Sequence, residues 1–315
     1  MIYQKFKQLI FGLALVAGCS IYAGAAQAPA RPLYDPSRIP WMALSFQAKN
    51  FWVKVSTNID LISLPAAEIE ALLLPSPKGN PIKPKTPQLY QMTINTLIDP
   101  IFRSPVSIYN RIWFNPTDAS ALGRIRLRRG EDDFKKVYRF TDRGVFRHLL
   151  EPKDKKEAAL DPEKWSRIKD SFYPYDLTRL GCAGATERSL PIYIISAADI
   201  SDVNDSLALC IFGKRQLHRM KFKREGTYPL TVNFIEKTKQ NEIRKEEQIN
   251  AIKIAIAAEP MESDLEEPED FSFLGLHKDL AIYIDSATHI PVQISGTIPT
   301  VGQADLKLDK VLLKN

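Results

Sequence analysis

The feature that most constrains this chain is an alternation of apolar and mostly polar residues that returns many times along it. Phe51, Val53 and Val55 open the first such run, which continues to Leu61. Successive side chains of a β-strand point to opposite faces, so the alternation predicts a strand with one buried face. About fourteen of these runs follow one another, most joined by short turns, which favours antiparallel neighbours over alternating strands and helices.

The predicted strands extend over the whole body of the chain. They lie at 51–61, 90–98, 106–114, 121–128, 134–140, 145–150, 190–196, 206–212, 216–222, 227–235, 250–258, 279–286, 289–298 and 303–313. The fold class that follows is mainly β: a large curved antiparallel sheet, or an open β-barrel-like meander, with one or two short helices.

Two helices and three loops interrupt this predicted meander. One helix is expected at 65–74 and the other at 161–172, where Asp161 suits the N-cap and Pro162 the first helical position. Charged or proline-rich stretches are expected to be solvated loops, and they lie at 75–87, 236–248 and 259–270.

The first residues have the pattern of an export signal. Lys5 and Lys7 precede an apolar stretch at 8–18. That stretch is too short to cross a bilayer, because a spanning helix needs about 20 apolar residues. Two cleavage sites compete: "VAGC", which ends at Cys19, resembles the lipobox of bacterial lipoproteins, whereas "AGA" suits ordinary signal peptidase and cleavage near residue 25. We favour the lipobox, which makes Cys19 a lipidated N-terminus.

The predicted organisation and location follow from this leader. Residues 1–18 are the signal peptide, 19–44 are a proline-rich tether, and 45–315 are a single β-rich domain, with a division into two lobes left open. Either cleavage exports the body to the cell envelope. Ser20 after the cysteine favours the outer membrane, so we expect a periplasmic protein of a Gram-negative bacterium, held to that membrane by lipid at Cys19.

The remaining cysteines suggest a disulfide. Cys182 and Cys210 are the only two left after Cys19, and an oxidising compartment permits them to pair. Two buried free thiols are the alternative, because spacing alone does not show proximity. No metal site is expected, since the four histidines, at 148, 218, 277 and 289, show no ligand spacing.

A basic stripe offers the clearest candidate binding residues. Arg124, Arg126 and Arg128 fall on one face of a predicted strand, with Ile125 and Leu127 on the other. Guanidinium groups bind phosphate and carboxylate well, so this face suits an anionic ligand. An ordinary solvent-facing sheet surface is the alternative. A second stripe of the same period contains Arg219, Lys221 and Lys223.

Aromatic residues also fall in phase with the apolar faces of their predicted strands. They are Phe51, Tyr90, Phe114, Tyr138, Phe140, Phe222, Tyr228 and Phe234. Such residues usually form a packed core. The alternative is a cavity on the concave side of the sheet for an acyl chain or another hydrophobic ligand.

Two segments resemble a known family. "FLGLHKDLAIYIDSATHIPVQISGTIPTVGQADLKL" (273–308) has a strand ending in an acidic turn, a hydrophobic-proline-valine step and a glycine before the last strand. It resembles the closing segment of the domain-of-unknown-function family thirty-one-oh-eight, a family of exported bacterial proteins. Residues 113–147 resemble another segment of the same family more weakly. The resemblance implies export and a curved antiparallel sheet, and it implies no activity.

These observations favour binding over catalysis. No nucleophile elbow, zinc-protease motif, P-loop or dinucleotide fingerprint occurs, so we expect no enzyme activity and no cofactor. The formal net charge of +6 falls by two when the leader lysines are removed, which gives no reason to expect nucleic acid. We expect a cell-envelope protein that binds a hydrophobic or amphiphilic envelope component. A structural or protein-interaction module of the periplasm is the alternative, followed by an enzyme of unrecognised type.

Overall fold

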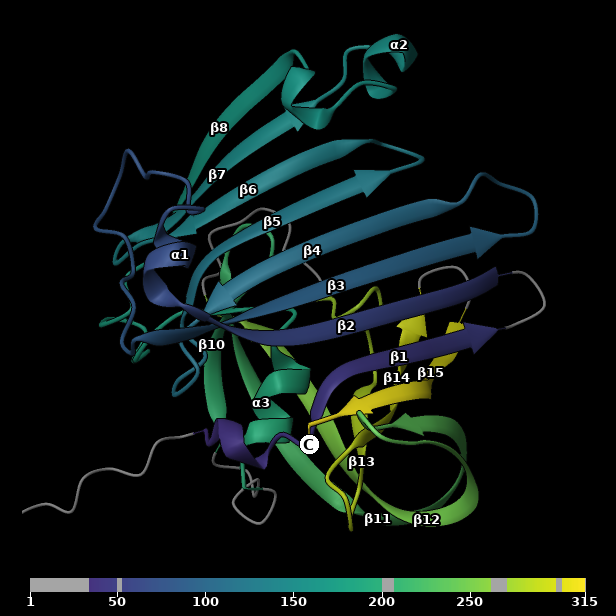
Figure 1. Cartoon of the computed structure of the whole chain (residues 1–315). Coiled ribbons are helices and arrows are strands. Elements are labelled where there is room, and N and C mark those ends of the chain that lie inside the picture. The colour runs from purple at the N-terminus through teal and green to yellow at the C-terminus, as the bar shows by residue number, and fades with distance from the viewer. Residues whose placement is uncertain (1–33, 50–52, 200–206, 262–270, 299–301, 315) are drawn as a thin grey trace, which may run out of the picture. The chain divides into compact units, whose positions relative to one another are not determined.

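Fifteen strands hydrogen-bond side by side in one mostly antiparallel sheet in the computed structural model (Figure 1). The structure describes residues 34–49, 53–199, 207–261, 271–298 and 302–314. The leader and the predicted lipidation site Cys19 lie outside these ranges. The predicted mainly β fold with few short helices is confirmed.

The sheet begins at the edge strand β8 and ends at β9. Its order is β8-β7-β6-β5-β4-β3-β2-β1-β15-β14-β13-β12-β11-β10-β9, and β10–β9 and β11–β15 are its parallel pairs among the described strands. The strands are β1 (Trp41–Lys49), β2 (Val53–Pro65), β3 (Gln88–Pro100), β4 (Val106–Phe114), β5 (Ala121–Arg129), β6 (Phe134–Phe140), β7 (Gly144–Glu151), β8 (Arg167–Pro174), β9 (Thr186–Glu187), β10 (Ala208–Phe212), β11 (Leu217–Lys237), β12 (Glu242–Pro260), β13 (Leu280–Asp285), β14 (Pro291–Ile298) and β15 (Gly302–Leu313).

Two long strands close part of the sheet into a ring. β11 has 21 residues and β12 has 19. The first part of β11 pairs with β10, while its last residues pair in parallel with β15, Ile235 opposite Lys310. Gly226 has a φ of +137° where the register between β11 and β12 shifts, and a bulge of this kind bends a strand. Strands β11 to β15 therefore form a hydrogen-bonded ring.

Short helices cover both faces of the sheet. They are η1 (Pro36–Arg38), α1 (Ala66–Glu70), α2 (Lys155–Ala158), η2 (Pro162–Lys164) and α3 (Pro191–Ala197). Ile69 of α1 packs with Trp113 and Leu122 on one face of β4 and β5. The opposite face, which we call the inner face, packs against α3: the Tyr193 ring meets the Phe114 and Tyr90 rings edge-on, at 4.6 and 5.8 Å between centroids.

Three predicted elements are wrong. Residues 190–196 form the helix α3, because Pro191 starts a helix and every residue of α3 is buried, so no alternation distinguishes it. Residues 161–172 form only the turn η2, capped by the Asp161 carboxylate on the Glu163 N–H at 2.9 Å, and then enter β8. The predicted loop 236–248 is mostly strand, because the β11–β12 hairpin extends charged residues into solvent on both faces.

The predicted tether and one aromatic assignment also differ. The tether was expected to reach residue 44, but Tyr34, Ile39 and Trp41 are fully buried, and the Trp41 indole donates to Ser196 Oγ of α3 at 3.2 Å. Tyr228 is 44% exposed and does not join the core. Phe51 lies outside the described residues. The other predicted aromatic residues are buried, except Tyr90, which is half-buried against the core.

The predicted disulfide is present. Cys182 bonds to Cys210 of β10, and the two cysteines are 28 residues apart in the sequence. The Arg219 guanidinium of β11 also donates to the carbonyl of Leu180, at 2.9 Å. Both contacts attach the segment that precedes β9 to the β10–β11 hairpin.

Removing the disulfide should weaken the fold by an amount set by its loop. We expect the Cys182→Ser, Cys210→Ser double variant to lose about 3–4 kcal/mol of unfolding free energy, because the bridge restricts the unfolded chain. Urea unfolding measures this, and wild type treated with reductant should match the variant. Equal stability of the oxidised wild type and the variant would contradict the expectation.

Candidate functional site

The strand register brings the predicted arginine stripe onto the inner face of the sheet. Arg124 lies opposite Ile112 of β4, Arg126 opposite Asn110, and Arg128 opposite Ile108. On the other side, Lys136 of β6 lies opposite Arg126. Arg124 is only 3% exposed, so the solvent-facing interpretation is wrong for this residue.

Arg124 forms a buried ion pair that the sequence did not reveal. Its Nη1 lies 2.5 Å from Oε1 of Glu187, and its Nη2 donates to Asn110 Oδ1 at 2.8 Å. The other carboxylate oxygen of Glu187 accepts from the backbone N–H of Ser189 at 2.6 Å. Both Glu187 oxygens and both terminal nitrogens of Arg124 therefore have partners, which offsets part of the desolvation of the pair, while Arg124 Nε is buried without a hydrogen bond. Glu187 lies in β9, at the far end of the sheet order from β5.

Arg126 has no such neutralising partner. Within the described ranges no carboxylate forms an ion pair with it, and its Nε, like that of Arg124, is buried without a hydrogen bond. Its guanidinium carbon lies 5.4 Å from the centre of the Phe134 ring. Burial, followed by the charges of Arg188 and Arg124, lowers the pKa of Arg126 to about 9, and the smaller effects of Tyr138 and Glu187 oppose this shift. Burial therefore makes the charged form of this guanidinium energetically unfavourable.

Two more cations surround Arg126. Arg188 is 6% exposed, and its Nη1 donates to Ser272 Oγ at 3.5 Å. Burial, followed by the charges of Arg126 and Arg147, lowers the pKa of Lys136 to about 8. Positive charge therefore accumulates on this part of the inner face.

Two adjoining cavities open beside these cations. The smaller, which we call the arginine cleft, has a volume of about 70 Å³ and is lined by Arg124, Arg126, Arg188 and Asn110 among others. The larger, which we call the apolar cavity, has a volume of about 500 Å³. The two cavities share four lining residues: Ile98, Ile108, Leu274 and Gly275.

The apolar cavity lies between the inner face and the C-terminal strands. Aliphatic side chains from β2, β3, β4, β14 and β15 line it, and they include Val55, Ile98, Val106, Ile298 and Leu306. Charged groups also line it: Arg103, Glu131 and Arg128, whose Nη1 lies 3.9 Å from Asp132. The combined space is apolar along most of its length and cationic at the end where it meets the arginine cleft.

A strained turn forms the shared wall of both cavities. Leu274 has a φ of +52° and Gly275 a φ of +86°, and Phe273 and Leu276 exchange two backbone hydrogen bonds of 2.9 Å. A positive φ is rare for a bulky residue, because its Cβ is crowded there. Strain of this kind is common at ligand sites, and here it places an apolar side chain between the two cavities.

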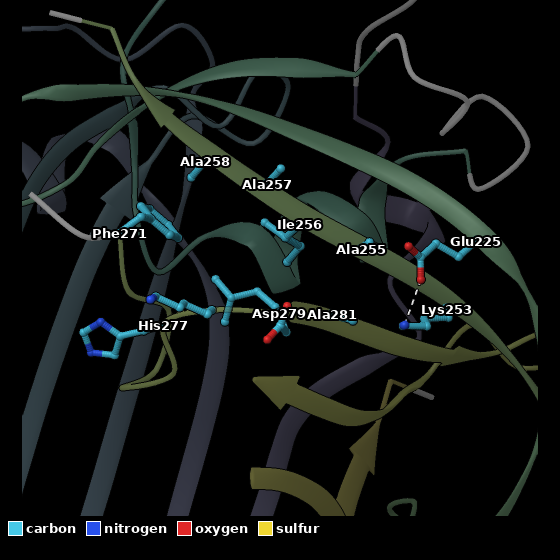
Figure 2. Close-up of a pocket in the computed structure, with 12 residues that line it drawn as sticks. Glu225, Lys253, Ala255, Ile256, Ala257, Ala258, Phe271, His277, Asp279 and Ala281 are labelled. Atoms are coloured by element: carbon cyan, nitrogen blue, oxygen red, sulfur yellow. Dashed lines mark ion pairs between the residues drawn. The ribbon is translucent and has the colours of Figure 1, made fainter. Parts of the chain in front are cut away.

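A third cavity lies along β12 and β13 and is shown in Figure 2. It has a volume of about 610 Å³, and small side chains line part of it, namely Ala255, Ala257 and Ala281. Lys253 and Glu225 neutralise each other there at 2.7 Å. Lys278 and Asp279 also line it, so charges of both signs are present and we base no ligand proposal on this cavity.

The other predicted groups do not gather at either cavity beside the arginines. Arg219 binds the Leu180 carbonyl, and Lys221 pairs with Glu259 at 3.4 Å. The disulfide leaves Cys182 without the thiol that a cysteine nucleophile needs. Across the described residues, no three histidine, cysteine, aspartate or glutamate side chains come close enough together to hold a metal ion.

Comparisons with known proteins found no match to this chain. The chain matches no protein-family model, and it has no match among curated proteins or solved structures. The resemblance of residues 273–308 and 113–147 to a family therefore stays a prediction. In the part of the chain that the structure describes, no helix has the length and apolar character needed to cross a membrane.

Unfolding free energies should show that Arg124, which is paired with Glu187, stabilises the fold and that Arg126 does not. Glu187→Gln should lower the free energy of unfolding by about 3–5 kcal/mol, because it breaks a buried ion pair beside other cations. Arg126→Met keeps the apolar stem and removes a charge that burial disfavours, so it should be neutral or stabilising by on the order of 1 kcal/mol. Urea unfolding of both variants measures this. A loss of stability in Arg126→Met as large as that in Glu187→Gln would show that Arg126 is a structural cation.

Proposed function

We propose that this protein binds an anionic amphiphile, with its apolar chain in the apolar cavity and its anionic group at the arginine cleft. The observation that carries the proposal is Arg126: a partly buried guanidinium that lies beside two other arginines and opposite no carboxylate of the described chain. A buried charge is costly unless it is paired. An anionic ligand would supply the missing pair.

The chemistry of the cleft suits recognition of a phosphate or carboxylate. Arg126 and Arg188 present planar guanidinium groups, which hold such anions through paired N–H donors. Arg124 already donates to Asn110 and to Glu187, so these residues support the cleft and leave Arg126 for a ligand.

The size and lining of the apolar cavity suit the rest of such a molecule. Its volume of about 500 Å³ falls in the range of small-molecule sites, roughly 300–1,000 Å³. Its aliphatic lining gains free energy by covering an apolar chain, and the cationic cleft at one end fixes the chain's direction.

The residues of the cleft favour binding over catalysis. No acid is among the residues that line it, and the nearby buried acid Glu187 is held in the ion pair with Arg124. The cleft's uncharged polar side chains belong to Thr96, Asn110, Ser189 and Ser272, and no base lies among the residues that line it. We therefore propose a non-enzymatic role that needs no cofactor. A structural or protein-interaction module remains the competing proposal, and a tightly filled core around α3 is the observation that favours it.

A binding assay with charge and volume variants tests the proposal. A dansyl-labelled fatty acid, which brightens in apolar surroundings, should bind the wild type. Arg126→Glu with Arg128→Glu should weaken binding about tenfold or more, because a charge-assisted hydrogen bond is worth about 1.5–3 kcal/mol. Ile98→Trp, which adds bulk where the two cavities meet, should weaken binding without changing the charge.

The control is Arg244→Glu, since Arg244 is an exposed arginine of β12 that lines neither cavity. It should bind the fatty acid as the wild type does, and all variants should unfold cooperatively. Failure of the wild type to bind, or equal affinity in the charge-reversed variant, would favour the structural role.

We also propose that the protein works in the cell envelope, attached to the outer membrane by lipid at Cys19. The support is the leader sequence, "VAGC" before Ser20, together with a disulfide that an oxidising compartment permits. An anchored protein would meet amphiphiles of the envelope at high local concentration.

Metabolic labelling tests the anchor. Cells that express the chain and receive a palmitate analogue should yield labelled protein, and Cys19→Ser should abolish the label. An unlabelled mature protein that begins near Ala26 would show ordinary secretion in place of lipidation.

A further inference from the structure

We propose that the turn between β3 and β4 inserts into the surface of an anionic lipid bilayer, so that the mouth of the apolar cavity faces the membrane. The turn consists of residues 101–105, and we call it the β3–β4 turn. The inference rests on the proposed function and deepens it by naming where the amphiphile would enter. The membrane contact itself is argued from the exposed residues of the turn.

The β3–β4 turn exposes two consecutive large apolar side chains. Phe102 is 81% exposed and Ile101 is 61% exposed, and Phe102 is the most exposed of the large apolar side chains described. Turns usually contain glycine, proline, asparagine, aspartate or serine. A single exposed apolar residue needs no explanation. Exposing a phenylalanine next to an isoleucine at the tip of a hairpin is unfavourable in water, which suggests a binding surface.

The turn forms the rim of the apolar cavity. Pro100, Arg103 and Ser104, which flank the two exposed residues, all line that cavity. Val106, where β4 begins, lines it as well and is 8% exposed. A membrane contact at Ile101 and Phe102 would therefore hold the opening against the lipid.

The charges near the turn suit an interfacial position. Arg103 follows Phe102 directly and would lie at the depth of lipid phosphates when Phe102 enters the acyl region. Asp99 and Glu131 are also exposed nearby, so attraction to anionic lipid is modest. Apolar insertion is then the main source of binding, with Arg103 favouring anionic headgroups.

Vesicle flotation tests this contact in the mature chain, from which the apolar leader has been removed. The chain would carry Cys19→Ser, so that no lipid anchor contributes, and the vesicles would contain phosphatidylcholine and phosphatidylglycerol. We expect this protein to float with the vesicles. Ile101→Ser with Phe102→Ser should reduce vesicle affinity about tenfold or more, as the loss of two buried apolar side chains predicts.

The matched control is Ile168→Ser. Ile168 is also 61% exposed, but it lies on the edge strand β8 and lines neither cavity. This variant should float as its parent does. The proposal is overturned if the parent does not bind vesicles, if the turn variant binds as its parent does, or if Ile168→Ser loses as much affinity.

A second measurement separates this proposal from the proposed function. In solution, without vesicles, the turn variant should bind the dansyl-labelled fatty acid as its parent does. Arg126→Met should bind the fatty acid more weakly and still float. Flotation that depends on Phe102 without any fatty-acid binding would retain the membrane contact and overturn the amphiphile site. Loss of solution binding in the turn variant would show that the turn shapes the cavity, and would overturn a separate membrane role.

Discussion

The buried ion pair between Arg124 and Glu187 connects parts of the sheet that are far apart in strand order. β9 is the edge strand at one end, and β5 lies near the other end. Next to the pair, the Ala121 N–H donates to the Ala185 carbonyl at 3.0 Å, and Ser120 bridges to Thr186. These contacts bring the segment at 185–189 onto the inner face. Arg188, Ser189 and the arginine cleft are placed there as a result.

Because Glu187 neutralises Arg124, Arg126 is the partly buried cation of this strand that has no carboxylate as an ion-pair partner among the described residues. Both side chains project from one face of β5, two residues apart, yet a carboxylate is supplied to only one of them. A fold selected for stability alone would gain by replacing the second arginine with an apolar residue, since burial disfavours its charge. The strained Leu274 next to it carries a similar cost. Costs of this kind concentrate where a protein binds something, because the ligand offsets them.

The sequence predicted the strands well and the long-range contacts poorly. Period-two alternation is a local signal, so it located most strands and put the three arginines on one face. The local nature of this signal also explains which elements were predicted wrongly. The buried run of α3 has no polar side to mark its period, and the β11–β12 hairpin extends charged residues beyond the core. Glu187 could not be assigned to Arg124, because 63 residues separate them and β9 is only two residues long.

The central claim is that the inner face holds an anionic amphiphile between Arg126 and the apolar cavity. Native mass spectrometry of the mature protein, purified from the envelope without added fatty acid, tests it most directly. The account predicts an adduct with the mass of a phosphate- or carboxylate-bearing lipid, bound one per chain and lost in the Arg126→Glu, Arg128→Glu variant. A wild type that carries no such adduct, or an adduct that persists in the variant, would contradict it.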